Sequence, residues 1–78
     1  MPHMLFTAGW CAPCQELNDI KENPPKGLEI IDVDKNPELV REKGIVAIPS
    51  LLKENGELVV GPAPIREEIE KLREENAG

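Results

Sequence analysis

Two cysteines three residues apart are the residues of this chain best suited to do chemistry. Cys11 and Cys14 are the only cysteines among 78 residues, and the only tryptophan, Trp10, directly precedes them. A cysteine reacts as its thiolate, and a position at a helix N-terminus lowers its ordinary pKa of about 8.5, sometimes to about 7 or below. Cys14 follows one helical turn after Cys11, close enough for the two sulfurs to bond. The spacing predicts a nucleophilic thiol and a resolving thiol.

The flanking segments predict how these thiols are positioned. Residues 3–7 are short and apolar, as in a buried strand, and residues 12–23 have apolar side chains at helical spacing. Pro13 fits the first turn of that helix, where a backbone N–H has no partner. Cys11 would then lie where a loop becomes a helix, beside unpaired N–H groups that stabilise an anion.

The rest of the chain predicts two further helices and three further strands. A strand at 28–33 would pair in parallel with the first, because a helix connects them, and its apolar, β-branched residues favour a central or nearly central position. The charged stretch from Arg66 to Glu75 in the last helix is interpreted as a solvated face. The other elements are a helix capped by Asn36, starting at Pro37 and closing at Gly44, strands near 51–53 and 58–60 joined by a tight turn at 54–57, and a helix at 65–76 after a break at 61–64.

Composition and charge exclude several classes of function. Nine Lys and Arg residues against fifteen Asp and Glu residues give a net charge of −6, which argues against binding nucleic acid or an anionic membrane. No apolar run comes near the roughly 20 residues of a membrane-spanning helix. Residues 1–4 do not form a basic region followed by an apolar core, so no secretory signal is expected and the cytoplasm is predicted. In that reducing compartment a lone Cys-x-x-Cys is catalytic or metal-binding more often than structural.

Two other interpretations of the cysteine pair are weaker. A structural zinc ion usually takes four Cys or His ligands, and beyond the two cysteines the chain offers only His3 and carboxylates. No metal site is therefore expected. A structural disulfide across three residues closes too small a loop to stabilise much. A redox role for Cys11 and Cys14 is favoured.

The segment from Phe6 to Cys14, Phe-Thr-Ala-Gly-Trp-Cys-Ala-Pro-Cys, resembles the active-site segment of thioredoxins. Their usual form is Trp-Cys-Gly-Pro-Cys, so Ala12 replaces a glycine. Asp32–Pro37, Gly44–Leu52 and Asn55–Gly61 resemble, in the same order, the family's next strand end and helix start, its cis-proline segment, and its terminal hairpin with the glycine that follows.

This resemblance covers nearly the whole chain and implies a fold. The fold is the minimal α/β thioredoxin-like core, β-α-β-α-β-β-α, with a four-stranded mixed sheet flanked by three helices. We expect it to form one domain over residues 1–78, glutaredoxin-like in size, without the additional strand and helix that precede this core in full-length thioredoxins.

The resemblance also implies a site. Cys11 and Cys14 would be catalytic. Pro49 would be cis and lie against the cysteines, and the backbone of Ile48 would receive an extended peptide by strand addition. The substrate-binding residues would be Trp10, Ala12, Pro13, Ile48, Pro49 and Gly61. From the residues alone, Pro49 could equally begin a strand, and Trp10 could belong to the core.

One departure from the family concerns the proton of the resolving cysteine. Thioredoxins usually carry a buried aspartate six residues before the first cysteine, with a lysine partner on the next strand. Those positions are Leu5 and Ile30 here. The usual proton acceptor for Cys14 is therefore absent, and Glu16 and Asp32 are candidates only by their proximity in sequence.

The implied function is thiol-disulfide exchange that reduces disulfides in client proteins. No bound cofactor is expected, and the protein would act as a monomer. Electrons would come from a thioredoxin-type reductase, NADPH- or ferredoxin-linked. Glutathione is less favoured because Gly61-Pro62-Ala63-Pro64 offers no side chain for its carboxylate. The alternatives are a glutaredoxin-like, glutathione-dependent enzyme and a non-catalytic module that binds peptides beside Ile48-Pro49.

Overall fold

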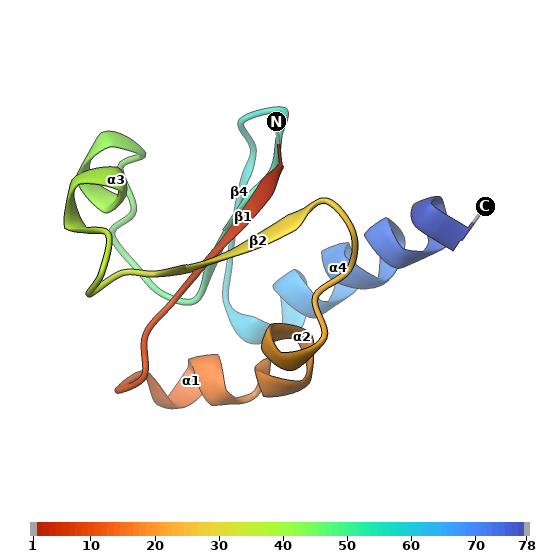
Figure 1. Ribbon diagram of the computed structural model, residues 1–78, viewed down its shortest axis with the longest axis horizontal. Helices are drawn as coiled ribbons and strands as arrows, with labels where there is room; N and C mark the ends of the chain where they lie inside the picture. The colour runs from red at the N-terminus through yellow and green to blue at the C-terminus, as the bar shows by residue number, and fades with distance from the viewer. Residues whose placement is uncertain (1, 78) are drawn as a thin grey trace.

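A four-stranded mixed sheet forms the centre of the computed structural model, which describes residues 2–77 (Figure 1). The strand order is β2-β1-β3-β4, with β1 and β2 parallel and the other neighbours antiparallel. The strands are β1 (His3–Thr7), β2 (Leu28–Asp32), β3 (Ser50–Leu52) and β4 (Leu58–Val60). The helices are α1 (Ala12–Gln15), α2 (Asn18–Glu22), α3 (Pro37–Glu42) and α4 (Pro62–Ala77). The α/β class and the mixed sheet are confirmed.

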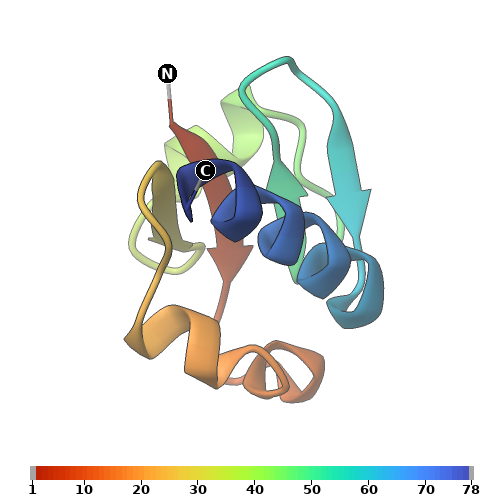
Figure 2. The same cartoon turned by 90° about the vertical axis from the view of Figure 1, so that its right-hand side faces the viewer.

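Alternation along the strands supplies a core layer to each face of the sheet. Leu5 of β1 and its neighbour Leu51 of β3 point toward the face that α2 and α4 cover, while Phe6 points toward α3. Figure 2 shows α4 lying along the first of these faces. The first layer is formed by Leu5, Leu17, Ile20, Leu28, Leu51, Ile65 and Ile69. The second layer is formed by Phe6, Ile31 and Ile45.

The strand at the centre of the sheet is β1. Leu5 and Phe6 have no exposed surface, and β1 is hydrogen-bonded on both sides. The prediction of a central position for the strand at 28–33 is wrong, because β2 pairs only with β1 and forms an edge. Its apolar residues Leu28 and Ile31 are buried by helices above and below the sheet, while Glu29 is exposed. Because helices cover both of its faces, β2 has the apolar composition that is typical of a central strand although it lies at the edge of the sheet.

The helix predicted over 12–23 is divided in two, so the described chain contains four helices in place of three. Around the break the hydrogen bonds shorten from i→i−4 to i→i−3: the Glu16 N–H donates to the Pro13 oxygen and the Leu17 N–H to the Cys14 oxygen. The Glu16 carbonyl leaves the helical pattern and accepts a hydrogen bond from Arg66. A hydrogen bond from a distant helix is thus made at the point where the segment, whose local spacing predicts one helix, is divided.

The other two helices differ slightly from their predicted limits. Asn36 does occupy the N-cap position of α3, but its side chain donates to the Asp32 carbonyl and not to the helix. The last helix begins at Pro62, three residues early, because prolines in a first turn lose no intrahelical hydrogen bond. Gly61, at φ 99°, makes the reversal from β4 into α4.

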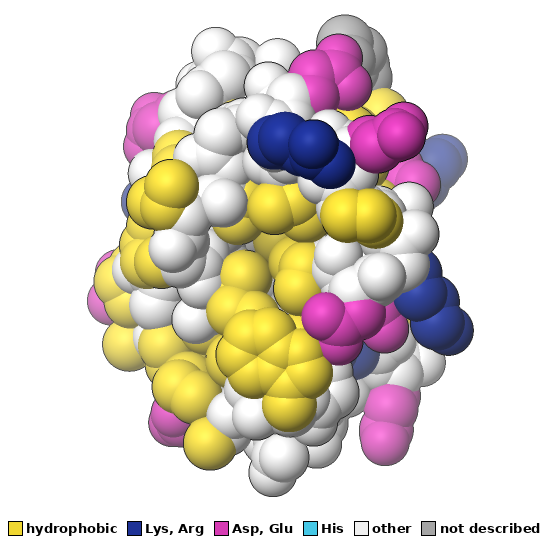
Figure 3. All heavy atoms as spheres, turned by 90° about the vertical axis from the view of Figure 1, so that its left-hand side faces the viewer, with side chains coloured by type: hydrophobic (Ala, Val, Ile, Leu, Met, Phe, Trp, Pro, Cys, Tyr) yellow, Lys and Arg dark blue, Asp and Glu magenta, His cyan; other side chains and the backbone are white. Residues whose placement is uncertain are grey.

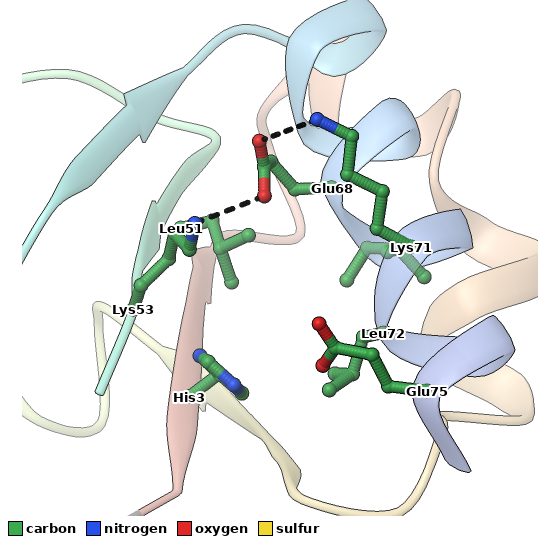
Figure 4. A pocket seen from close by; sticks show the side chains of 8 residues that line it. His3, Leu51, Lys53, Glu68, Lys71, Leu72 and Glu75 are labelled. Carbon is green, nitrogen blue, oxygen red and sulfur yellow. Dashed lines mark ion pairs between the residues drawn. The ribbon is translucent and has the colours of Figure 1, made fainter. Parts of the chain in front are cut away.

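The charged side of α4 is only partly a solvated face. Arg66 binds Asp19 of α2, and Glu68 lies between Lys53 and Lys71, at 3.1 and 3.6 Å (Figure 4). Lys53 and Glu68 keep only 23% and 21% of their side-chain surface exposed. Their cavity lies beside His3 at the start of β1, whereas the cysteines follow the end of that strand. Charges of α4 thus bind it to α2 and to the residue that follows β3.

The Arg66–Asp19 pair makes a prediction about pH and stability. Its hydrogen bonds lower the pKa of Asp19 from 3.8 to about 2. A carboxyl whose pKa is lower in the folded state stabilises the fold above its unfolded pKa and loses that effect as the pH falls through the folded one. We expect Asp19→Asn to lower the urea midpoint modestly at neutral pH, since the pair is exposed. The difference from wild type should close between about pH 4 and about pH 2.

The matched control is Glu22→Gln, which removes an exposed carboxylate from the same helix. It should leave the urea midpoint near the wild-type value throughout. A difference for Asp19→Asn that is the same at pH 7 and at pH 2 would show that the ion pair does not produce it.

Candidate active site

The two cysteines lie just beyond the end of β1, joined in a disulfide. Cys11 is the N-cap of α1, with extended backbone angles of −90° and 110°, and Cys14 lies within the helix. Their Cα atoms are 5.2 Å apart. Cys11 retains 4% of its surface exposed and Cys14 none. Of the two residues, Cys11 is therefore the one that keeps exposed surface.

A backbone N–H points at the sulfur of Cys11. The N–H of Cys14 donates to the Cys11 Sγ at 3.2 Å. The sequence predicts stabilisation of a thiolate by the N-terminus of a long helix, but α1 has only four residues, and a macrodipole grows with the number of aligned peptides. The direct N–H contact is the interaction that would favour a thiolate at Cys11.

The loop before β3 closes over the same sulfur. The Ile48-Pro49 peptide is cis, as the resemblance implies. The Ile48 carbonyl oxygen lies 3.9 Å from the Cys11 Sγ. The N–H of Gly61 donates to the Pro49 carbonyl at 3.1 Å. The structure thus brings Ile48 to Cys11, and it brings Gly61 to the proline that follows Ile48.

Trp10 stands on the surface beside the cysteines and is no part of the core. It is 68% exposed, and its Nε1 donates to Asp34 Oδ2 at 2.8 Å. With its neighbours it lines an apolar groove, and Figure 3 shows hydrophobic side chains gathered on this face. The groove is lined by Trp10, Val33, Val40, Ile45, Val46, Ala47 and Ile48.

Asp34 and Val46 were not identified as site residues from the sequence. Both lie in segments that carry the family resemblance, which was the available signal. Asp34 fixes the indole of Trp10 through a contact across 24 residues. Val46 is 94% exposed, directly in the groove. Ala12 and Pro13, which the resemblance also implies as substrate-binding residues, are exposed between the two cysteines.

Apolar side chains occupy the place where the family has its buried charges. Leu5 is completely buried and lies opposite Ile30 in the register of β1 and β2, and both pack in one apolar cluster. Around the cysteines lie Ala8, Val33 and Ile48. Glu16 and Asp32 are the two residues that the sequence offers as proton acceptors for Cys14. Glu16 is exposed, and Asp32 accepts a hydrogen bond from the Asp34 N–H. The surroundings of Cys14 are apolar.

Residues 2–77 contain no group of three or more His, Cys, Asp or Glu side chains that could hold a metal ion. Within the same residues, no helix is long and apolar enough to cross a membrane.

The chain matches two families of known proteins, the KaiB domain family and the thioredoxins. The KaiB domain family matches residues 11–76. Thioredoxin from Listeria monocytogenes is 39% identical over 77 residues, covering 86% of this chain and 74% of that protein. Among solved structures, thioredoxin from Trypanosoma brucei brucei matches with a TM-score of 0.67 and 25% identity over 99% of this chain and 75% of its own. Trichomonas vaginalis thioredoxin matches with a TM-score of 0.61 and 34% identity, over 88% and 76%.

Proposed function

We propose that this chain, which belongs to the thioredoxin family and over residues 11–76 to the KaiB domain family, reduces disulfides of client proteins with Cys11 as nucleophile and Cys14 as resolving thiol. It is a thioredoxin-like dithiol-disulfide oxidoreductase. The observation that carries the proposed roles is the unequal burial of the bonded pair, since only Cys11 reaches the surface.

The reaction proceeds by two exchanges of a disulfide bond. The Cys11 thiolate attacks one sulfur of the client disulfide, so that a Cys11–client bond forms and the other client sulfur leaves as a thiolate. The Cys14 thiolate then attacks the Cys11 Sγ, the Cys11–Cys14 bond forms, and the second client sulfur leaves. Two electrons pass to the client, and the pair ends oxidised.

Client binding uses the surface around Cys11. An extended client segment lies along the backbone of Ile48, held by main-chain hydrogen bonds as an added strand. The apolar groove beside Trp10 receives its neighbouring side chains. The hydrogen bond from the Gly61 N–H to the Pro49 carbonyl supports this role, because it joins the segment of Gly61 to the cis-proline loop. The contact residues are Trp10, Ala12, Pro13, Ile48, Pro49 and Gly61.

The electron donor is a thioredoxin-type reductase, NADPH- or ferredoxin-linked. Glutathione needs donors for its carboxylate, and the segment 61–64 has few to offer. Pro62 and Pro64 lack an N–H, and the Gly61 N–H is already bonded to the Pro49 carbonyl. The protein acts as a single-domain monomer in the cytoplasm, where a reductase keeps its thiols reduced.

Cysteine variants test these roles with a model protein disulfide as client. Cys14→Ser should accumulate a covalent adduct with the client, because the first exchange occurs and the second cannot. Cys11→Ser should form none, since the thiol that remains is buried. The adducts are resolved by non-reducing electrophoresis and identified by mass spectrometry.

Turnover of the wild type identifies the donor in the same assay. NADPH with a thioredoxin reductase should support faster reduction of the client than glutathione with glutathione reductase. A wild type that binds the client without reducing it, with unchanged affinity in Cys11→Ser, would contradict the enzymatic account and favour a peptide-binding module.

The apolar surroundings of Cys14 predict a pH-dependent second exchange. With Leu5 and Ile30 in place of a charged pair, no buried carboxylate takes the proton from Cys14, so only the thiolate already present can attack. The first-order rate of the second exchange should rise by about tenfold or more from about pH 6 to about pH 9. Stopped-flow release of a chromogenic leaving thiol measures this rate, and Cys14→Ser gives the first exchange alone. A rate of the second exchange that stays flat over this range would contradict the hypothesis.

A further inference from the structure

We propose that Arg66 is a positioning residue for the dithiol: from α4 it fixes the break between α1 and α2, and with it the place of Cys14. The inference rests on the proposed resolving role of Cys14. Arg66 touches neither cysteine, and it would act through the short helix that carries Cys14.

Arg66 binds both sides of the break at once. Its Nη2 donates to the Glu16 carbonyl at 2.6 Å and to Asp19 Oδ1 at 2.9 Å, while its Nη1 donates to Asp19 Oδ2 at 3.0 Å. Glu16 is the C-cap of α1, and Asp19 lies in the first turn of α2. The planar fork of a guanidinium can make such a set of contacts, whereas an ammonium group cannot.

The carbonyl that Arg66 binds is the one withdrawn from the helical pattern. In a continuous helix the Ile20 N–H would donate to the Glu16 oxygen, four residues earlier. Here the N–H groups of both Ile20 and Lys21 donate to the Leu17 oxygen, each at 3.0 Å. Arg66 replaces the missing donor. Its contact therefore stabilises the broken arrangement over the continuous helix that the local sequence predicts.

The break is directly connected to Cys14. The Leu17 N–H donates to the Cys14 carbonyl at 3.0 Å. Leu17 itself is fully buried in the same apolar cluster as Ile65, the residue before Arg66. The junction is thus held by α4 from the inside through apolar packing and from the outside through Arg66; α1 and α2 lie below α4 in Figure 2.

The position of the junction between α1 and α2 affects the second exchange, which starts from the mixed disulfide. In the oxidised protein the covalent bond fixes Cys14 against Cys11. In a mixed disulfide on Cys11 that bond is absent, and the distance between the Cys14 sulfur and its target depends on where α1 is held. Small displacements of a reacting group reduce rates strongly.

The same helix supplies a matched control. Arg73, also on α4, donates from Nη2 to the Asn23 carbonyl at 3.0 Å, at the far end of α2. It makes the same kind of contact, arginine to backbone carbonyl across 50 residues, but to a segment that carries no cysteine. Arg66→Met and Arg73→Met therefore both remove an arginine-to-carbonyl contact, at two distances from the site, while Asp19→Asn controls for the ion pair that Arg66→Met also removes.

The test is a stopped-flow reaction of the fully reduced protein with excess dithiobis(nitrobenzoate), followed by the absorbance of the released thionitrobenzoate. Cys11 attacks the reagent, releasing one thionitrobenzoate in a phase that depends on reagent concentration. Cys14 then attacks the Cys11 Sγ, the Cys11–Cys14 bond forms, and the second thionitrobenzoate leaves in a first-order phase. All variants are compared where circular dichroism shows them fully folded.

We expect Arg66→Met to slow the first-order phase about tenfold or more while leaving the first phase unchanged. Arg66→Lys should restore part of the rate, because an ammonium group can still donate one hydrogen bond to the Glu16 carbonyl. Asp19→Asn, which keeps the carbonyl contact, and Arg73→Met should stay near the wild-type rate even where their urea midpoints fall. A purely structural role would change midpoints alone.

An Arg66→Met variant that resolves as fast as Arg73→Met overturns the inference. So does an equal loss in Arg66→Met and Asp19→Asn, which would assign the effect to the ion pair and not to the carbonyl contact. A wild type without any first-order phase would instead contradict the proposed role of Cys14 itself.

Discussion

The site depends on the burial of one strand. β1 is paired on both sides and has a helical layer on each face, and its Leu5 and Phe6 are completely buried. The chain that leaves β1 after Thr7 therefore emerges at a fixed point, and Cys11 follows four residues later. The pairing of Phe6 with Ser50 sets the register of β3, so Pro49, the residue before Ser50, arrives beside the same point. One strand register thus places Cys11 against the cis-proline loop.

Within this frame, differences in environment separate two chemically identical thiols. Cys11 retains 4% of its surface exposed, and its sulfur accepts a backbone N–H. Cys14 has no exposed surface and lies among apolar residues. The first environment suits a thiol that meets a client, and the second suits one that reacts only within the molecule. Leu5, at the position of the family's buried aspartate, is itself part of an apolar cluster.

Features with a local cause were predictable from the sequence, and features set by distant contacts were not. The limits of β1, the turn around Gly56 and the proline-initiated α3 follow from patterns of a few residues. The carbonyl at the break after Gln15 is bound by Arg66, 50 residues away, and the indole of Trp10 is bound by Asp34. The edge position of β2 was hidden because helices bury both of its faces. Within the candidate site, spacing and the family resemblance indicated Cys11, Cys14 and Ile48, whereas the unequal burial of the two cysteines and the contact of Trp10 with Asp34 follow only from the tertiary fold.

In the proposed reaction, Cys11 and Cys14 together give two electrons to a client disulfide. A redox titration measures this exchange: the protein is equilibrated in dithiothreitol or glutathione buffers, and its thiols are trapped and counted. We expect one transition in which both thiols disappear together, near about −270 mV, the value typical of thioredoxin. A midpoint above about −200 mV would indicate glutaredoxin or oxidase chemistry. Thiols that never pair with each other would contradict the proposed reaction outright.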